Sequence, residues 1–264
     1  MILLLGGTAE TVPISRALVD AGFSVLLSME TSMMLRESLP QIVKRRSGPL
    51  DAQGMASVIT ENKIIAVVDA THPYAALASH NAWHASRMTG VPYFAYERLP
   101  SITDAPDICR AVDHDHAARI ACSFGTPILL TIGSRHLAPY VGRARSNSIP
   151  VIARVSRNPQ SIKLCREAGL GPSQILTADG PFSVSENSAT IKLNRIGVLV
   201  TKDSGDAGGV PAKISAARDA GCRIVVVSRP ARPCSGFGSI SELLRALRFS
   251  LESNVSERFQ RLTP

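Results

Sequence analysis

Val67-Val68-Asp69-Ala70-Thr71-His72-Pro73-Tyr74-Ala75 is the stretch in which a predicted buried strand meets a polar turn. The residues before it are apolar and mostly β-branched, and residues 75–88 have helical spacing. A hydrophobic strand, a polar turn and a helix together predict a site at the carboxyl end of a parallel strand. Thr71 and His72 are therefore candidate site residues. The alternative explanation is a capped helix start, with Thr71 or Asp69 as the cap.

The composition predicts a folded protein. The chain has 264 residues, of which 45% are apolar, so it suits one large or two modest domains. No apolar run is long enough to span a bilayer, and residues 1–5 read as a first strand rather than a signal peptide. Five scattered cysteines without a Cys-x-x-Cys pair favour a reducing cytoplasm. His80 and His84 have the spacing of metal ligands, but without a third ligand no metal site is predicted.

The chain carries a net charge of +8. Nucleic acid is not the expected partner, because the basic residues are dispersed and aromatic residues make up only 5% of the chain. A cationic cleft also concentrates small polyanions. A small anionic ligand is therefore the favoured partner, and a simply basic surface is the alternative.

The first residues predict an anion site. Residues 1–9 read as a short strand that runs into a glycine turn, and residues 10–21 read as a helix. Backbone amides at the start of a helix bind anions, and the helix dipole adds to the attraction. The pattern Gly-Gly-x-x-Glu is shorter than the full dinucleotide fingerprint. The predicted cofactor-binding residues at this turn are Gly6, Gly7, Thr8, Ala9 and Glu10.

The second predicted strand ends among hydroxyl side chains. An NAD site places an acidic residue at this point, where it holds the ribose 2′-hydroxyl. Here Ser28, Thr31 and Ser32 follow the strand, and basic residues 44–46 lie downstream, which favours a 2′-phosphate and hence NADP. Glu30 is the opposing signal, because a carboxylate that faces the ribose would favour NAD.

Strands and helices alternate through the rest of the chain, which predicts parallel sheets with helices on both faces. A stretch rich in proline and aspartate at residues 99–107 is the predicted domain boundary. We expect an N-terminal dinucleotide-binding domain at 1–103, a C-terminal domain at 104–245 and a tail at 246–264.

Loops in the second half also follow predicted strands. Gly133-Ser134-Arg135 offers a hydroxyl and a guanidinium, which suit a carboxylate or a phosphate, although a helix cap is the alternative. Residues 202–209 begin with a lysine and contain three glycines, which permit close approach of a ligand. This loop is not a P-loop, because the lysine precedes the glycines. Residues 179–183 taken alone read as a turn.

Five motifs, in order along the chain, resemble the precorrin-6A reductase family of cobalamin biosynthesis. They are Leu-Leu-Leu-Gly-Gly-Thr-Ala-Glu at 3–10, Asp-Ala-Thr-His-Pro-Tyr-Ala at 69–75, Thr-Ile-Gly-Ser at 131–134, Gly-Pro-Phe-Ser at 180–183 and Thr-Lys-Asp-Ser-Gly-Asp-Ala-Gly-Gly at 201–209. The resemblance extends from the first strand to Arg229-Pro230. Thr11 and Tyr74 stand where relatives usually carry a small residue and phenylalanine, and neither departure threatens the implied function.

The resemblance implies an α/β fold of two Rossmann-like, doubly wound parallel-sheet halves, with the active cleft between them. It also implies NADPH-dependent reduction of one carbon–carbon double bond of precorrin-6A to the dihydro product precorrin-6B, without a metal or a flavin. The acetate and propionate groups of this tetrapyrrole would use the positive charge of the chain. Neighbouring enzymes of the pathway are candidate partners for transfer of intermediates.

The predicted site roles complete this interpretation. Thr71 and His72 are assigned to the cofactor, with His72 towards the nicotinamide. Lys202 and His72 are the predicted catalytic residues: Lys202 stabilises charge or donates a proton, and a plain charge anchor is its alternative role. The predicted substrate-binding residues are Ser134, Arg135, Gly180, Lys202, Asp203, Ser204, Gly205, Gly208 and Gly209.

Two other functions compete with this interpretation. Short-chain reductases and sugar-nucleotide epimerases pair a tyrosine and a lysine as Tyr-x-x-x-Lys, and none of Tyr74, Tyr93, Tyr96 and Tyr140 has a lysine at that spacing. A non-catalytic dinucleotide-sensing module is the second competitor. The polar loops of the second half count against it, because a sensor has little need of them.

Overall fold

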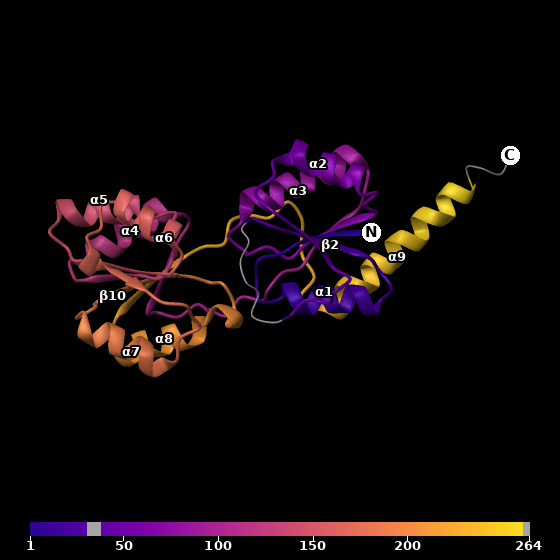
Figure 1. The fold of residues 1–264 in the computed structure, drawn as a ribbon. Coiled ribbons are helices and arrows are strands. Elements are labelled where there is room, and N and C mark those ends of the chain that lie inside the picture. The colour runs from indigo at the N-terminus through magenta and orange to yellow at the C-terminus, as the bar shows by residue number, and fades with distance from the viewer. Residues whose placement is uncertain (31–37, 261–264) are drawn as a thin grey trace. The chain divides into compact units, whose positions relative to one another are not determined.

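The computed structural model describes residues 1–30 and 38–260, with side chains as far as residue 253. The chain forms two compact units: unit 1 contains residues 1–99 and the chain from residue 230 onward, and unit 2 contains residues 100–229. Each unit has its own parallel sheet with helices on both faces (Figure 1). The predicted α/β class with two doubly wound halves is confirmed.

The described part of unit 1 contains a five-stranded sheet in the order β3-β2-β1-β4-β5, in which every pairing is parallel. Its central strands are apolar and fully buried, as expected for a parallel sheet that is covered on both faces. The strands are β1 (Ile2–Leu5), β2 (Val25–Met29), β3 (Lys44–Ser47), β4 (Ala66–Asp69) and β5 (Tyr93–Ala95).

In the described part of unit 1, four helices cover the sheet. One face packs against α2 and α3, and the other packs against α1 and α9 (Figure 1). Asp51 starts α2 by accepting a hydrogen bond from the Gly54 amide at 2.7 Å, while Gly90 ends α3 in the left-handed conformation. The helices are α1 (Thr11–Asp20), α2 (Ala52–Glu61), α3 (Ala76–Thr89) and α9 (Ile240–Gln260).

The described part of unit 2 contains a six-stranded sheet in the order β6-β11-β10-β7-β8-β9, and its pairings are also parallel. The chain moves outward from β7 to β9 and returns to β10, so strand order reverses between β7 and β10. The strands are β6 (Ile108–Ala111), β7 (Ile128–Leu130), β8 (Val151–Val155), β9 (Ile175–Thr177), β10 (Val198–Lys202) and β11 (Arg223–Val227).

The helices of unit 2 also form two layers. Helices α7 and α8 cover one face of the sheet, and α4, α5 and α6 cover the other (Figure 1). Ser183 begins α7 with a capping box. Its hydroxyl accepts a hydrogen bond from the Glu186 amide, and the Glu186 carboxylate accepts one from the Ser183 amide. The helices are α4 (His114–Ser123), α5 (Ala138–Ser146), α6 (Pro159–Glu167), α7 (Val184–Leu193) and α8 (Val210–Asp219), with single turns at η1 (Pro172–Gln174) and η2 (Asp206–Gly208).

The division of the chain differs from the expected one at its C-terminal end. The expected second domain ended at residue 245 and was followed by a tail, but the chain leaves unit 2 at residue 229. Helix α9 then contributes Leu243 and Leu247, both completely buried, to the core beside α1. The correction has a simple cause: apolar residues of this segment cover a sheet face that α1 alone does not cover. Strand β3 and helix α5 were also not predicted as elements.

Candidate functional site

In unit 1 the loop after β1 is closed by a threonine. The Thr11 hydroxyl accepts hydrogen bonds from the amides of Gly7 at 2.9 Å and Thr8 at 3.1 Å. Gly7 has a φ of +108°, and a Cβ at Gly6 would lie 2.7 Å from both Leu27 Cδ1 and Thr11 Cγ2, so both positions require glycine. Two of the amides predicted to face a pyrophosphate therefore have an internal partner.

The predicted cofactor residues at the next two positions differ in environment. Ala9 is exposed, whereas Glu10 is half-buried and forms an ion pair with Arg98. Thr8 donates a hydrogen bond from its hydroxyl to the Ala70 carbonyl at 3.0 Å, which joins the loops that follow β1 and β4. Arg98 is a residue that sequence reasoning missed, because nothing in a sequence indicates which arginine pairs with a glutamate 88 positions away.

The end of β2 combines a hydroxyl with a guanidinium. Arg46 Nη1 donates to Ser28 Oγ at 2.7 Å and to the Gly48 carbonyl at 3.0 Å. This contact follows from the parallel register, in which Ser28 lies opposite Arg46 of β3. Ser28 and a basic residue from 44–46 thus meet at the carboxyl end of β2, and their contact with a 2′-phosphate stays a prediction. Thr31 and Ser32, the other predicted contacts, lie outside the described residues.

The loop after β4 is organised by a buried carboxylate. Asp69 is completely buried and accepts hydrogen bonds from the Thr71 amide at 2.9 Å and the Tyr93 hydroxyl at 2.6 Å. Burial and the neighbouring Asp69 carboxylate raise the pKa of Tyr93, so this phenol stays protonated. His72 Nδ1 accepts from the Tyr74 amide at 3.2 Å, which fixes the side chain within this loop.

The predicted unit 1 residues therefore converge. Strand order reverses between β1 and β4, and open α/β sheets bind ligands at the carboxyl ends of strands at such a point. The loops after β1 and β4 carry Gly6–Glu10, Thr71 and His72, and the adjacent strand β2 ends at Ser28 and Arg46. This donor set fits a phosphorylated dinucleotide, because a guanidinium and a hydroxyl stand where a 2′-phosphate would lie.

In unit 2 the loops after β7 and β10 lie at the point where strand order reverses. Gly133 has a φ of +80°, Ser134 is half-buried, and Arg135 is exposed. Burial, followed by the charge of Arg135, lowers the pKa of Lys202 from 10.5 to about 8. The structure thus brings together the two basic residues that the sequence assigned to substrate.

Two stacked histidines adjoin these cations. The rings of His114 and His136 lie 4.3 Å apart between centroids, and Tyr140 Oη lies 3.0 Å from His114 Nδ1. Burial, His136 and Lys202 lower the pKa of His114 to about 4, so this imidazole is neutral at pH 7. Sequence reasoning missed this pair, although both residues stand close to strand ends.

Asp203 has internal partners, and its predicted contact with substrate stays a prediction. The side chain is 3% exposed and accepts hydrogen bonds from the amides of Ser101 at 3.0 Å and Ile102 at 3.1 Å. Arg229 also pairs with it, through Nη2 at 3.4 Å from Oδ1. Asp203 therefore joins the segments through which the chain enters and leaves unit 2, and it anchors the loop that presents Lys202.

The glycines predicted to bind substrate have identifiable conformational roles. Gly205 and Gly209 adopt φ values of +78° and +65°, which favour glycine. A Cβ at Gly208 would lie 1.9 Å from Oγ of Ser204, a buried residue, and one at Gly180 would lie 3.0 Å from the Phe182 ring. The loops after β9 and β10 therefore need these glycines for their own conformations. Whether they also contact a substrate stays a prediction.

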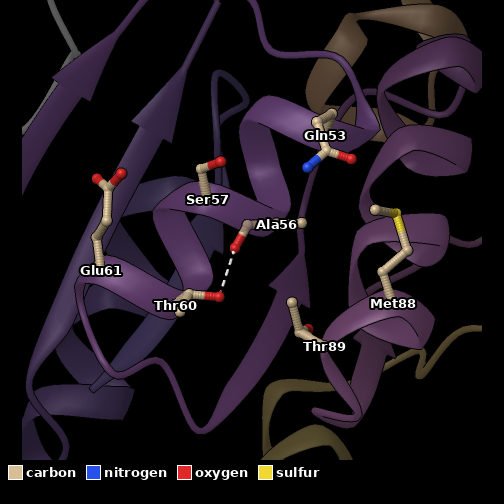
Figure 2. Close-up of a pocket in the computed structure, with 7 residues that line it drawn as sticks. All are labelled: Gln53, Ala56, Ser57, Thr60, Glu61, Met88 and Thr89. Atoms are coloured by element: carbon tan, nitrogen blue, oxygen red, sulfur yellow. Dashed lines mark hydrogen bonds between the residues drawn. The ribbon is translucent and has the colours of Figure 1, made fainter.

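A surface hollow in unit 1 lies away from these residues. It is formed by α2 and the end of α3, and Thr60 on its wall donates to the Ala56 carbonyl at 3.0 Å (Figure 2). The end of α3 leads into the amino end of β5, so this hollow belongs to the opposite edge of the sheet from Thr71 and His72. Its lining residues are Gln53, Ala56, Ser57, Thr60, Glu61, Met88 and Thr89.

Two further observations concern membrane-spanning helices and metal ligands. Among residues 1–30 and 38–260, no helix is both long and apolar enough to cross a membrane. The same residues contain no group of three potential metal ligands, and His80 and His84 lie on α3 without a third. The fold and these sites define a two-unit α/β protein with a dinucleotide-type loop in unit 1 and a cationic strand edge in unit 2.

Comparison with known proteins identifies the family. Residues 1–248 match the family described as precorrin-6x reductase CbiJ/CobK, and the chain belongs to this family of reductases of cobalamin biosynthesis. It is 32% identical over 231 residues to the cobalt-precorrin-6A reductase of Priestia megaterium, covering 87% of this chain and 91% of that protein. It is 33% identical over 235 residues to the precorrin-6A reductase of Rhodococcus erythropolis, covering 88% and 90%.

A solved structure agrees with this assignment. The structure described as CobK precorrin-6A reductase superposes with a TM-score of 0.76 at 27% sequence identity, over 94% of this chain and 96% of the other. The family resemblance inferred from five motifs is therefore confirmed.

Proposed function

We propose that this chain reduces one carbon–carbon double bond of precorrin-6A, with NADPH as the reductant, to give precorrin-6B in cobalamin biosynthesis. The observation that carries the proposal is the pair of cations at the carboxyl edge of the unit 2 sheet, where Lys202 has a pKa of about 8 beside Arg135. A substrate rich in acetate and propionate groups fits such a surface. The five cysteines are free thiols in the structure, which fits a reaction in a reducing cytoplasm.

The preference for NADPH is supported by the end of β2. When bound, NADPH supplies the hydride for the reduction. Arg46 and Ser28 would bind the 2′-phosphate, since a guanidinium is the side chain best suited to a phosphate. The exposed residues Gly7 and Ala9 would lie along the pyrophosphate, while Thr71 and His72 would orient the nicotinamide half.

On the substrate side, Arg135 and Ser134 would bind a carboxylate, and the loop at 204–209 would shape the surface around it. Addition of a hydride to a conjugated double bond leaves negative charge that must be neutralised by a proton. Lys202 would hold this proton at Nζ, because a group with a pKa near the working pH both carries and releases a proton readily. Its positive charge would also stabilise the developing anion before the proton moves.

The test is oxidation of NADPH, followed at 340 nm, with purified precorrin-6A and separately with its cobalt complex, since relatives carry both names. We expect oxidation that requires the tetrapyrrole and is weaker with NADH. A dinucleotide-sensing module would bind NADPH without oxidising it in the presence of either compound. Another NADP-linked reductase would oxidise NADPH only with a different substrate, and either outcome would overturn the proposal.

A further inference from the structure

An arginine is buried in the unit 2 sheet without a charged partner. Arg154 is the penultimate residue of β8 and is 8% exposed. Its Nη2 donates to Asn187 Oδ1 on α7 at 2.7 Å, and its guanidinium carbon lies 4.1 Å from the centroid of the Phe182 ring. Its Nη1 is buried and has no hydrogen-bond partner. An unsatisfied buried donor on a charged group is costly, so its presence needs an explanation.

The guanidinium is nevertheless held in one orientation. The Asn187 amide group donates to the carbonyls of Ser183 at 2.7 Å and Phe182 at 3.3 Å, which directs its Oδ1 at Arg154. The aromatic ring lies against the guanidinium, Nη2 is held by Asn187, and Nη1 is the donor left without a partner. A guanidinium fixed in this way directs Nη1 as a charged donor toward an anion.

A second cation adds to the positive charge. Lys213, on α8, has a pKa lowered from 10.5 to about 8 by burial and then by the charges of Arg154 and Lys202. Among the residues that the structure describes, neither Arg154 nor Lys213 forms an ion pair. The acid that attracts Arg154 is Glu186, but Glu186 is exposed and accepts hydrogen bonds from the Ser183 amide and hydroxyl, both at 2.7 Å.

The register of the sheet places Arg154 on the opposite face from Lys202. Val200, Leu130 and Ala153 are aligned neighbours on β10, β7 and β8, so they share one face of the sheet. Lys202 is two residues beyond Val200 and belongs to the same face, whereas Arg154 belongs to the opposite face, next to α7. The carboxyl edge of the sheet thus carries positive charge on both sides.

We propose that Arg154 and Lys213 form a second anion subsite, which binds a carboxylate of the substrate on the α7 and α8 side of the sheet. The inference rests on the proposed function, because it assigns the ligand to the tetrapyrrole. Lys202, Arg135 and Ser134 serve a different carboxylate or the reacting region on the other side. A ligand that spans the sheet edge must carry several separated carboxylates, and acetate and propionate groups around a macrocycle meet that requirement.

The experiment measures the dissociation constant of precorrin-6A by isothermal titration calorimetry without NADPH, so that no turnover occurs. We expect Lys213→Met and Arg154→Gln each to raise this constant at least tenfold, while the dissociation constant of NADPH stays within twofold of wild type. Matched controls are Lys163→Met and Arg157→Gln, because these side chains are 66% and 73% exposed. Neither control should change the binding of the tetrapyrrole.

The outcomes separate this inference from the proposed function. If both variants bind precorrin-6A within twofold of wild type, the subsite is overturned while the reductase function stands. If the wild type binds the tetrapyrrole but does not reduce it, the reductase function falls and the variants still decide the subsite. If the wild type does not bind it, both fall. Should Arg154→Gln fail to fold, as circular dichroism would show, the half-buried Lys213 decides the result by itself.

Discussion

The two sheets end in loops of opposite electrostatic character. At the carboxyl edge of the unit 1 sheet the polar groups have internal partners: Glu10 pairs with Arg98, and Asp69 accepts from Tyr93. At the same edge of the unit 2 sheet, burial and the charges of neighbouring basic residues lower the pKa values of Lys202 and Lys213 to about 8.

The difference follows from what each edge would bind. A dinucleotide is recognised largely by backbone shape at a glycine turn, so the side chains around the turn are free to stabilise the loop. A substrate with several carboxylates is recognised by charge, so the basic residues that face it carry most of the recognition. Ligand binding by unit 2 is therefore expected to depend on single basic residues more strongly than ligand binding by unit 1.

The largest effect is expected from Lys202→Met, which keeps the side-chain stem and removes the charge and the proton. Loss of a general acid that also stabilises charge should lower kcat by about 100- to 1000-fold, roughly 3–4 kcal/mol. The dissociation constant of NADPH should stay nearly unchanged, and Lys163→Met is the control. A rise in KM for precorrin-6A with kcat intact would instead make Lys202 a charge anchor.

Asp203→Asn tests whether the same loop is held from within unit 2. Breaking the buried contact with Arg229, and weakening the bonds to the Ser101 and Ile102 amides, should lower the free energy of unfolding by about 3 kcal/mol. Urea denaturation followed by circular dichroism measures this change. Asp179→Asn, which removes an exposed ion pair with Arg157, should cost less than about 1 kcal/mol. Equal losses in the two variants would contradict the anchoring role.

Arg46→Gln removes the guanidinium that we expect to bind the 2′-phosphate of NADPH in unit 1. Loss of one charge-assisted contact to a 2′-phosphate should raise the dissociation constant of NADPH about 10- to 30-fold, roughly 1.5–2 kcal/mol. NADH lacks that phosphate, so its binding should hardly change. The neighbouring Arg45 is exposed, and Arg45→Gln is the matched control. Equal weakening of NADPH and NADH would show that Arg46 only supports the loop.

The smallest expected effect is the pH dependence of the wild type. Lys202 with a pKa of about 8 is mostly protonated at pH 7 and mostly neutral at pH 9. A proton donor loses activity as pH rises through its pKa, so kcat/KM should fall about tenfold across this interval. Lys213 loses its charge over the same range. The pH profile of Lys213→Met therefore decides which of the two lysines causes the decline. That variant should keep the decline in kcat, whereas Lys202→Met should lose it.

Much of the architecture was predictable from local patterns. Short β-branched and leucine-rich runs bounded by glycine and proline, alternating with helical spacing, indicated two parallel sheets, and the strands at 151–155 and 223–227 lie at the predicted residues. The exceptions have a common cause. Strand β3 is made of Lys44, Arg45, Arg46 and Ser47, an exposed basic edge strand with no hydrophobic signal. Helix α9 is held by tertiary packing on α1.

The residues of the candidate site also divide into those that local sequence predicted and those that it did not. Residues that follow a strand directly, such as His72, Ser134 and Lys202, were predictable because the carboxyl ends of parallel strands meet at one edge. Arg154 lies inside a buried strand, where a lone arginine was a signal that passed unnoticed. Lys213 lies on a helix among residues of ordinary amphipathic spacing, and nothing local distinguishes it.

The sequence by itself determined the family, the α/β class and the strand-end residues, because these depend on neighbours within about ten positions along the chain. Only the tertiary structure decided which polar groups are paired and which are not. It directed Asp203 to the Ser101 and Ile102 amides and Glu10 to Arg98, and it left Arg154 without a carboxylate. The formal charge of a side chain follows from the residue type alone. Its desolvation and its partners depend on the elements that fold around it, and these set the pKa of Lys202 and the binding capacity of the unit 2 edge.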